Sequence, residues 1–285
     1  MYEVTTQIAY FPTAGPDITT APPFAYDMRD PASRGESESE IKSTQIHNGR
    51  DIQTSLASTG FVLLDEPSGV IDFLDHERVV DKYYAECKSL AQELTGASTV
   101  FTYDHLVREP GRQIAGGGTD GSVHVTGEEQ GGGYIGFAHM DYTDNTGWKD
   151  YLAVHAQEVP SASRVVCLNF WRGISRVVDD HPLAVCDART IRATDLFETK
   201  IFGYGPPSYS WHDVGIETYS VKHSASHKWY YFPKMTPNEV LIFKTYDSEG
   251  VIGNACAHAA FTNPVADPAG PQRRSIELRV LCFID

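Results

Sequence analysis

The sequence predicts a mainly β protein whose core is a sandwich or a barrel, with flanking helices and an extended arm around it. From residue 98 onward, short apolar runs rich in β-branched and aromatic residues alternate with turns of Gly, Pro, Asp or Asn. Only residues 76–95 show a clear helical period. The chain has 285 residues, of which 41% are hydrophobic, so it can bury one full core.

The first 60 residues are predicted to form an N-terminal arm and loop that pack on the core. An opening strand-like segment is followed by a proline-rich stretch and then by the polar run SRGESESEIKS. This composition is typical of extended, irregular structure. The arm could cover its own barrel or that of a second copy, so a homodimer is a possible assembly.

One helix is expected from His76 to Thr95, because apolar side chains recur there every three or four positions and Gly96 supplies a stop. Residues 61–285 are predicted to form a single domain with a long insertion around residues 180–230. The expected strands lie in GFVLL, TVFTYDHLVR, GYIGFAHMDYT, SRVVCLNFWRGI, HPLAVCDA, KWYYFP, EVLIFKTYDS, CAHAAFTNP and SIELRVLCFI.

Charge and cysteine usage narrow the function classes. The formal net charge is -15, which repels nucleic acid and anionic membrane surfaces, so neither is an expected partner. No apolar run reaches the roughly 18–20 residues that span a bilayer, and the N-terminus has no secretory pattern. The five cysteines form no CxxC pair, which fits free buried thiols in a reducing, cytoplasmic location.

The most informative local motif is His139-Met140-Asp141. In a strand, residues two apart point to the same face, so the imidazole and the carboxylate would converge. They would supply two corners of the two-histidine, one-carboxylate triad that binds iron(II) and leaves coordination positions open. Because His-x-Asp pairs also arise by chance, the motif requires support from elsewhere in the chain.

That support comes from the C-terminal region. His258 lies in the small, apolar setting CAHAAF, and Arg273 and Ser275 follow about one hairpin later, sharing a strand face with Glu277 and Arg279. A guanidinium and a nearby hydroxyl can together bind a carboxylate. The far carboxylate of 2-oxoglutarate is such a group, so the order of these motifs favours an iron(II) and 2-oxoglutarate site.

Two other classes of protein fit parts of this pattern. A non-catalytic β-barrel that binds a small molecule would use the same histidines and arginines structurally. A zinc-dependent hydrolase is the other alternative, since two histidines and a carboxylate also bind zinc. The hydrolase hypothesis lacks an HExxH motif and leaves Arg273 and Ser275 unexplained.

Long stretches of the chain carry a family resemblance over roughly residues 60–285. They are YDHLVR, HMDYT, NFWRGI, PLAVCDAR, WYYFPKMTPNEVLIFKTYDS, HAAFTNP and RRSIELRVLCF. These stretches resemble the AsaB/CmcJ-like hydroxylase/desaturase family of secondary metabolism, which is similar to fungal endoperoxide-forming enzymes. The resemblance implies a jelly-roll (double-stranded β-helix) core that uses iron(II), 2-oxoglutarate and O2 to hydroxylate, desaturate or rearrange a hydrophobic natural-product intermediate. It implies metal ligands at His139, Asp141 and His258, with Arg273 and Ser275 on the cosubstrate.

Further polar and aromatic side chains are candidates for the pocket. Arg172 lies in an otherwise apolar strand, where it is expected either to bind the cosubstrate or to form a buried ion pair. His212 is the alternative third metal ligand. His223 and His227 are expected in solvent, because lysines flank them. The candidate substrate contacts are Arg108, Tyr103, Tyr142, Trp211 and His212.

Overall fold

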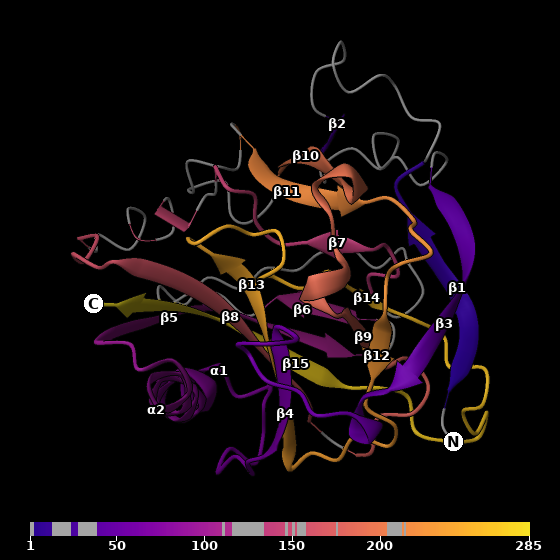
Figure 1. Ribbon diagram of the computed structural model, residues 1–285. Coiled ribbons are helices and arrows are strands. Elements are labelled where there is room, and N and C mark those ends of the chain that lie inside the picture. Colours follow the sequence, from indigo (N-terminus) through magenta and orange to yellow (C-terminus); the bar gives the residue numbers. More distant parts are fainter. Residues whose placement is uncertain are drawn as a thin grey trace.

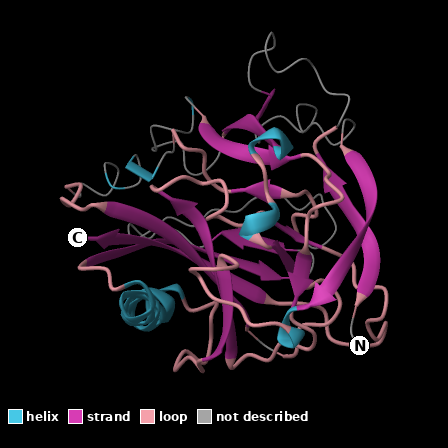
Figure 2. Cartoon of the chain, viewed as in Figure 1, coloured by secondary structure: helices cyan, strands magenta, loops and turns pink. Residues whose placement is uncertain are grey.

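The computed structural model describes residues 3–12, 24–27, 39–109, 112–115, 134–145, 148–149, 152, 158–174, 176–203, 213 and 215–285. Strands dominate this part of the chain and form two curved sheets, while one long helix lies beside them (Figures 1 and 2). The prediction of a mainly β fold is confirmed.

The larger sheet has nine strands in the order β1-β3-β12-β9-β14-β7-β11-β10-β2. They are β1 (Val4–Tyr10), β2 (Phe24–Asp27), β3 (Glu40–Asn48), β7 (His139–Met140), β9 (Leu183–Cys186), β10 (Leu196–Phe202), β11 (Ile216–Val221), β12 (Trp229–Tyr231) and β14 (His258–Ala260). Neighbouring strands are antiparallel, except that β3 runs parallel to β12 and β2 runs parallel to β10. The short strands β7 and β14 pair in the middle of the sheet.

The smaller sheet has six antiparallel strands in the order β4-β13-β8-β15-β5-β6. They are β4 (Phe61–Asp65), β5 (Thr99–Glu109), β6 (Arg112–Ala115), β8 (Arg164–Gly173), β13 (Glu239–Asp247) and β15 (Ser275–Ile284). Strand residues alternate between the two faces of this sheet. We call the face toward the larger sheet the inner face and the opposite one the outer face.

The inner face packs against the larger sheet. Trp171 of β8 and Phe243 of β13 belong to one buried cluster with Val185 of β9 and Tyr230 of β12. Because His258 pairs directly with Val185, His258 lies on the same face of the larger sheet as this cluster. The inner space between the sheets therefore contains both apolar packing and the predicted metal-binding histidine.

The expected helix covers the outer face. It begins with α1 (His76–Arg78), passes through a π-helical turn (Val79–Tyr83) and continues as α2 (Tyr84–Thr95). Gly96 adopts a left-handed φ of 69° and ends the helix, as the sequence predicts. Apolar side chains from α2 pack with alternate residues of β8 and β15. Within the described chain, no helix is long and apolar enough to cross a membrane.

The proposed division into arm, domain and insertion does not coincide with the strand pairing. In the first 60 residues, β1 and β3 pair with each other, and β3 also pairs with β12, so they are part of the larger sheet. Likewise, the region expected as an insertion around residues 180–230 contributes β9, β10, β11 and β12 to that sheet. Both segments are therefore integral to the sheet.

Candidate active site

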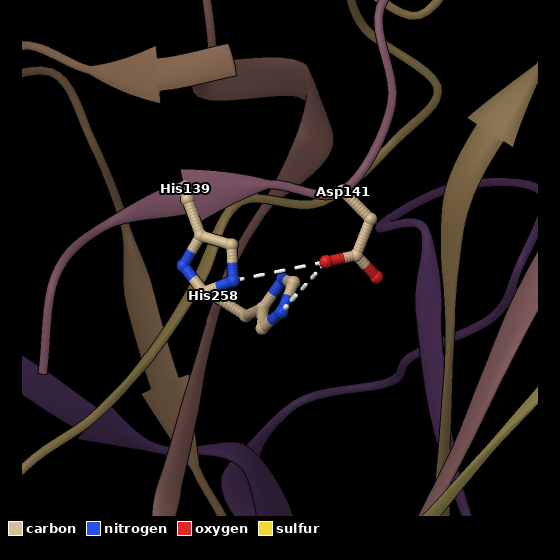
Figure 3. A group of neighbouring side chains, drawn as sticks. All are labelled: His139, Asp141 and His258. Atoms are coloured by element: carbon tan, nitrogen blue, oxygen red, sulfur yellow. Dashed lines mark ion pairs between the residues drawn. The ribbon is translucent and has the colours of Figure 1, made fainter. Parts of the chain in front are cut away.

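His139 and His258 are cross-strand neighbours at the centre of the larger sheet. β7 and β14 pair with His139 directly opposite His258, so both imidazoles project from one face. Asp141 lies at a bend just after β7. The three side chains point toward one another (Figure 3). His139 and Asp141 therefore converge as the sequence predicts, although Asp141 lies just outside the strand.

The geometry of this group is compact. Nε2 of His139 lies 3.7 Å from Oδ1 of Asp141, and Nε2 of His258 lies 3.5 Å from the same oxygen. One potential ligand atom from each of the three residues lies within 4.8 Å of the others. In the described part of the chain, this is the one group of three or more His, Cys, Asp or Glu residues that could hold a metal.

Both imidazoles can present a ring nitrogen to a metal. Nδ1 of His139 lies 2.8 Å from the carbonyl oxygen of Phe137, so an Nδ1–H donates to it and leaves the lone pair on Nε2. Burial, reinforced by the neighbouring His139, lowers the pKa of His258 to about 4. His258 is therefore uncharged at neutral pH, as metal ligation requires.

Asp141 supplies the negative charge of the group. Burial raises its pKa, but His258, Arg279, His139 and a hydrogen bond from Asn169 outweigh burial and hold the pKa below its ordinary value. Its Oδ2 is buried and has no hydrogen-bond partner among the described residues. An unpaired buried carboxylate oxygen is costly, and a cation would stabilise it. Two neutral imidazoles and one carboxylate fit iron(II).

Ser275 begins β15 on the inner face, and Arg273 lies two residues before it with its guanidinium over Trp171 of the same face. Arg273 is 2% exposed. Its Nε donates to Oγ of Ser275 at 3.0 Å, and its Nη1 donates to the carbonyl oxygen of His181 at 2.7 Å. These acceptors are neutral, and the other guanidinium N–H groups have no hydrogen-bond partner among the described residues. A buried cation with spare donors is suited to bind a carboxylate.

Among the described side chains, Arg108, Glu277 and Arg279 form a charged group on the inner face. Arg108 of β5 lies opposite Ser275, and its Nη2 is 3.7 Å from Oε2 of Glu277. Arg279 donates to Oε1 of the same glutamate at 3.3 Å. Glu277 therefore lies between two arginines beside the metal-binding group. Arg108, a candidate substrate contact, does lie on the inner face.

Arg172 takes neither of its predicted roles among the described residues: it does not face the site of the cosubstrate, and its hydrogen-bond partners are neutral groups. It lies on the outer face of β8, opposite Ile276 of β15. Its three nitrogens donate to the hydroxyl of Tyr83 and to the carbonyl oxygens of Pro237 and Glu66, at 3.3, 3.2 and 2.9 Å. Arg172 thus anchors the helical layer and does not face the site of the cosubstrate.

The other candidates divide into two groups. Tyr142 is 5% exposed and packs edge-on against Tyr246, so it belongs to the apolar core. Trp211, His212 and the side chain of Tyr103 lie outside the described residues, and His212 therefore stays an untested alternative ligand.

The expectation that His223 and His227 lie in solvent is wrong for His227. Its side chain is 1% exposed, and its Nε2 lies 3.1 Å from Oδ2 of Asp195. His223 packs edge-on against Tyr10, with ring centroids 5.2 Å apart.

Two residues near the site were not anticipated. Asn169 lies in the middle of β8, close enough to Asp141 to contribute to the lowered pKa of that carboxyl group. The sequence could have indicated Asn169, because a single amide side chain in the apolar run VVCLNFW is unusual. Tyr134 stacks on the guanidinium of Arg273, with 4.1 Å from Cζ to the ring centroid. No sequence pattern marks Tyr134, which follows a glycine-rich stretch.

Comparisons with known proteins bear on the class of the protein. A family model described as "Oxidoreductase/YMDC permease-like domain" matches residues 10–283. The hydroxylase/desaturase efuI of Hormonema carpetanum is 33% identical over 252 residues, covering 80% of this chain and 78% of that protein. The alpha-ketoglutarate-dependent dioxygenase phiK of a fungal species is 29% identical over 255 residues, covering 87% of this chain and 86% of that protein.

A solved structure matches over nearly the whole length. The iron and alpha-ketoglutarate-dependent endoperoxidase NvfI superimposes with a TM-score of 0.71 at 24% identity, covering 99% of this chain and 97% of that chain. This likeness establishes the fold, and the expected jelly-roll core is confirmed.

Two facing sheets with a His-Asp-His group between them define a mononuclear non-haem iron oxygenase. The chain belongs to the family of the matched model and of the hydroxylase/desaturases, and the AsaB/CmcJ-like resemblance is confirmed. It is an oxidoreductase of the Fe(II)/2-oxoglutarate-dependent dioxygenase class and acts on a small molecule with O2 as co-reactant.

Proposed function

We propose that His139, Asp141 and His258 hold the iron, and that Arg273 and Ser275 bind the far carboxylate of 2-oxoglutarate. The observation that carries this assignment is the convergence of three ligand atoms within 4.8 Å of one another on the inner side of the larger sheet. A second, independent observation is the buried guanidinium of Arg273, whose partners are neutral. The two features supply the metal site and the anion site that the reaction requires.

Bound iron(II), together with 2-oxoglutarate, supplies the activation of dioxygen for oxidation of an unreactive C–H bond. The chain contributes orientation and exclusion of water. The bond from His139 to the Phe137 carbonyl fixes one imidazole. The ring of Phe243 packs on His258 with centroids 4.9 Å apart and keeps that side of the site apolar. Arg273 orients the cosubstrate through its far end.

For the substrate, we propose a hydrophobic natural-product intermediate that is hydroxylated, desaturated or rearranged. Glu277 lies between Arg108 and Arg279 on the inner face, and the aromatic residues Trp171 and Phe243 provide apolar surface on the same face. The net charge of -15 and the five free, buried cysteines support a cytoplasmic enzyme without a nucleic-acid partner. A homodimer stays a prediction, which light scattering would test.

Anaerobic titration with iron(II) and 2-oxoglutarate tests the ligand assignment. The wild-type protein is expected to develop the metal-to-ligand charge-transfer absorption of a chelated 2-oxo acid. His139→Ala and His258→Ala should abolish that band at equimolar iron, whereas His47→Ala, at a surface histidine paired with Glu3, should retain it. Retention of the band in His258→Ala and its loss in His212→Ala would show that the third ligand is His212.

A further inference from the structure

Hydrogen bonds use only some of the N–H donors of the Arg273 guanidinium. Its Nε donates to Oγ of Ser275 at 3.0 Å, and its Nη1 donates to the carbonyl oxygen of His181 at 2.7 Å. Its backbone N–H donates to the carboxylate of Asp180, at 3.0 and 3.1 Å to the two oxygens. The backbone N–H, the Nε–H and one N–H of Nη1 are therefore anchored, and the unused donors are the two N–H groups of Nη2 and the second N–H of Nη1.

Tyr134 makes several contacts with Arg273 and its surroundings. Its ring lies 4.1 Å from Cζ of Arg273, and Trp171 lies 5.2 Å from the same carbon. The hydroxyl of Tyr134 donates to the carbonyl oxygen of Arg273 at 2.7 Å. The ring also packs against His181, whose carbonyl accepts from Arg273, with centroids 4.7 Å apart. Tyr134 thus contacts the guanidinium, the backbone and one acceptor of Arg273.

This contact matters because Arg273 is buried beside another cation. Burial and the nearby Arg108 lower the pKa of Arg273 to about 9, so the group is still charged at neutral pH. An aromatic face stabilises a desolvated cation before its anionic ligand arrives. It also restricts rotation of the guanidinium plane, which reduces the ordering that ligand binding would otherwise require.

We infer that Tyr134 is a positioning residue for 2-oxoglutarate: its ring holds the guanidinium plane of Arg273 so that the unused N–H groups of Nη1 and Nη2 meet the far carboxylate. This inference rests on the proposed role of Arg273. It assigns a function to the segment that leads into β7, because Tyr134 lies five positions before His139. Tyr134 acts through Arg273 and does not itself contact the metal.

The test compares two 2-oxo acids of equal carbon length. 2-Oxoglutarate has the far carboxylate, and 2-oxopentanoate lacks it. The dissociation constant of each is measured anaerobically on the iron(II)-loaded protein by the charge-transfer band. For Tyr134→Leu, we expect affinity for 2-oxoglutarate to fall about fivefold to thirtyfold, the range of a desolvated cation–π contact. Affinity for 2-oxopentanoate should stay unchanged, so the preference for the dicarboxylate falls by the same factor.

Tyr134→Phe is the matched control, because it keeps the ring and removes only the hydroxyl; its preference should stay within about threefold of wild type. Tyr134→Met takes the place of the leucine variant if that protein does not fold. An unchanged preference in Tyr134→Leu, or an equal loss for both acids, would overturn the inference. A wild-type protein with no preference for 2-oxoglutarate would instead contradict the role of Arg273.

Discussion

Two buried arginines lie near each other on opposite faces of the smaller sheet, and their surroundings differ. On the outer face, Arg172 donates to a hydroxyl and two carbonyl oxygens, so all three nitrogens have partners. On the inner face, Arg273 has two neutral acceptors and spare donors. A buried arginine with every nitrogen bonded stabilises the fold, whereas one with unused donors is available to a ligand. Burial alone does not distinguish these roles.

The two faces of β15 show the same difference between apolar packing and polar groups of the site. The outer face of β15 contributes Ile276, Leu278 and Val280 to the apolar layer under α2. The inner face of the same strand contributes Ser275 and Glu277 to the site. We therefore expect substitutions on the inner face to alter ligand binding and substitutions on the outer face to alter stability.

The largest difference should come from Arg273→Ala. A buried charge pair typically loses about 2–5 kcal/mol when one partner is removed, so affinity for 2-oxoglutarate should fall by a factor between about thirty and several thousand. The free energy of unfolding should stay equal or rise, since an uncompensated buried cation is removed. Ligand titration and urea unfolding on one preparation measure both quantities. A variant that unfolds easily but binds normally would break the comparison.

Leu278→Ala should produce the converse result. Leu278 is fully buried between β15 and the helical layer. Truncation should lower the free energy of unfolding by about 2–5 kcal/mol because it leaves a cavity. The dissociation constant of 2-oxoglutarate should change less than twofold in the folded protein. A clear loss of affinity would show that the two faces are coupled.

Protonation of His105, on the outer face, should make the free energy of unfolding depend on pH. This residue pairs with Leu278 in register and hydrogen bonds through Nδ1 with the Tyr84 hydroxyl at 2.9 Å. Burial, with a contribution from His76, lowers its pKa from 6.5 to about 4. The unfolded chain therefore binds the proton more readily, and stability present above pH 6.5 is lost as the pH falls toward 4.

The size of this effect follows from the pKa shift. The shift from 6.5 to about 4 corresponds to a loss of about 3 kcal/mol of unfolding free energy as the pH falls through this range. His105→Gln should flatten the pH dependence of unfolding by this amount, while His47→Gln at the surface should leave it intact. Equal slopes for wild type and His105→Gln would exclude His105 as the source.

The smallest change is expected for Arg172→Met. This substitution keeps an apolar stem of similar length but leaves the Tyr83 hydroxyl and two carbonyl oxygens without their donor. The cost should be about 1–3 kcal/mol in unfolding free energy, with unchanged affinity for 2-oxoglutarate. Weaker binding of the cosubstrate would restore the role that the sequence first suggested for this residue.

The fold was predictable where local patterns were strong. Alternation and β-branched content placed β5, β8, β13 and β15, and the 3.6-residue period with Gly96 placed the helix. β3 was missed because its sequence, EIKSTQIHN, is mostly polar and only its last part is buried. Its place in the sheet depends on pairing with β12, far along the chain, which no local pattern encodes.

Some contacts within the site were also predictable from the sequence. Spacing of two residues correctly indicated that His139 and Asp141 converge, and the Arg-x-Ser pattern correctly placed Arg273 beside Ser275. Sequence could not tell which face Arg172 occupies, because an apolar strand buried on both faces has no polar alternation to fix its direction. It also could not reveal Tyr134, whose role arises entirely from a tertiary contact.

The parallel pairing of β3 with β12 has a consequence for how the chain is made. β3 is synthesised long before β12, so the paired strands β1 and β3 have no docking edge until most of the polypeptide has been translated. Contacts between such distant segments slow folding. Without residues 1–48, the edge of β12 would be open to strands from other molecules, a recognised route to aggregation. The strand pair β1–β3 that completes the sheet therefore also protects the edge of β12.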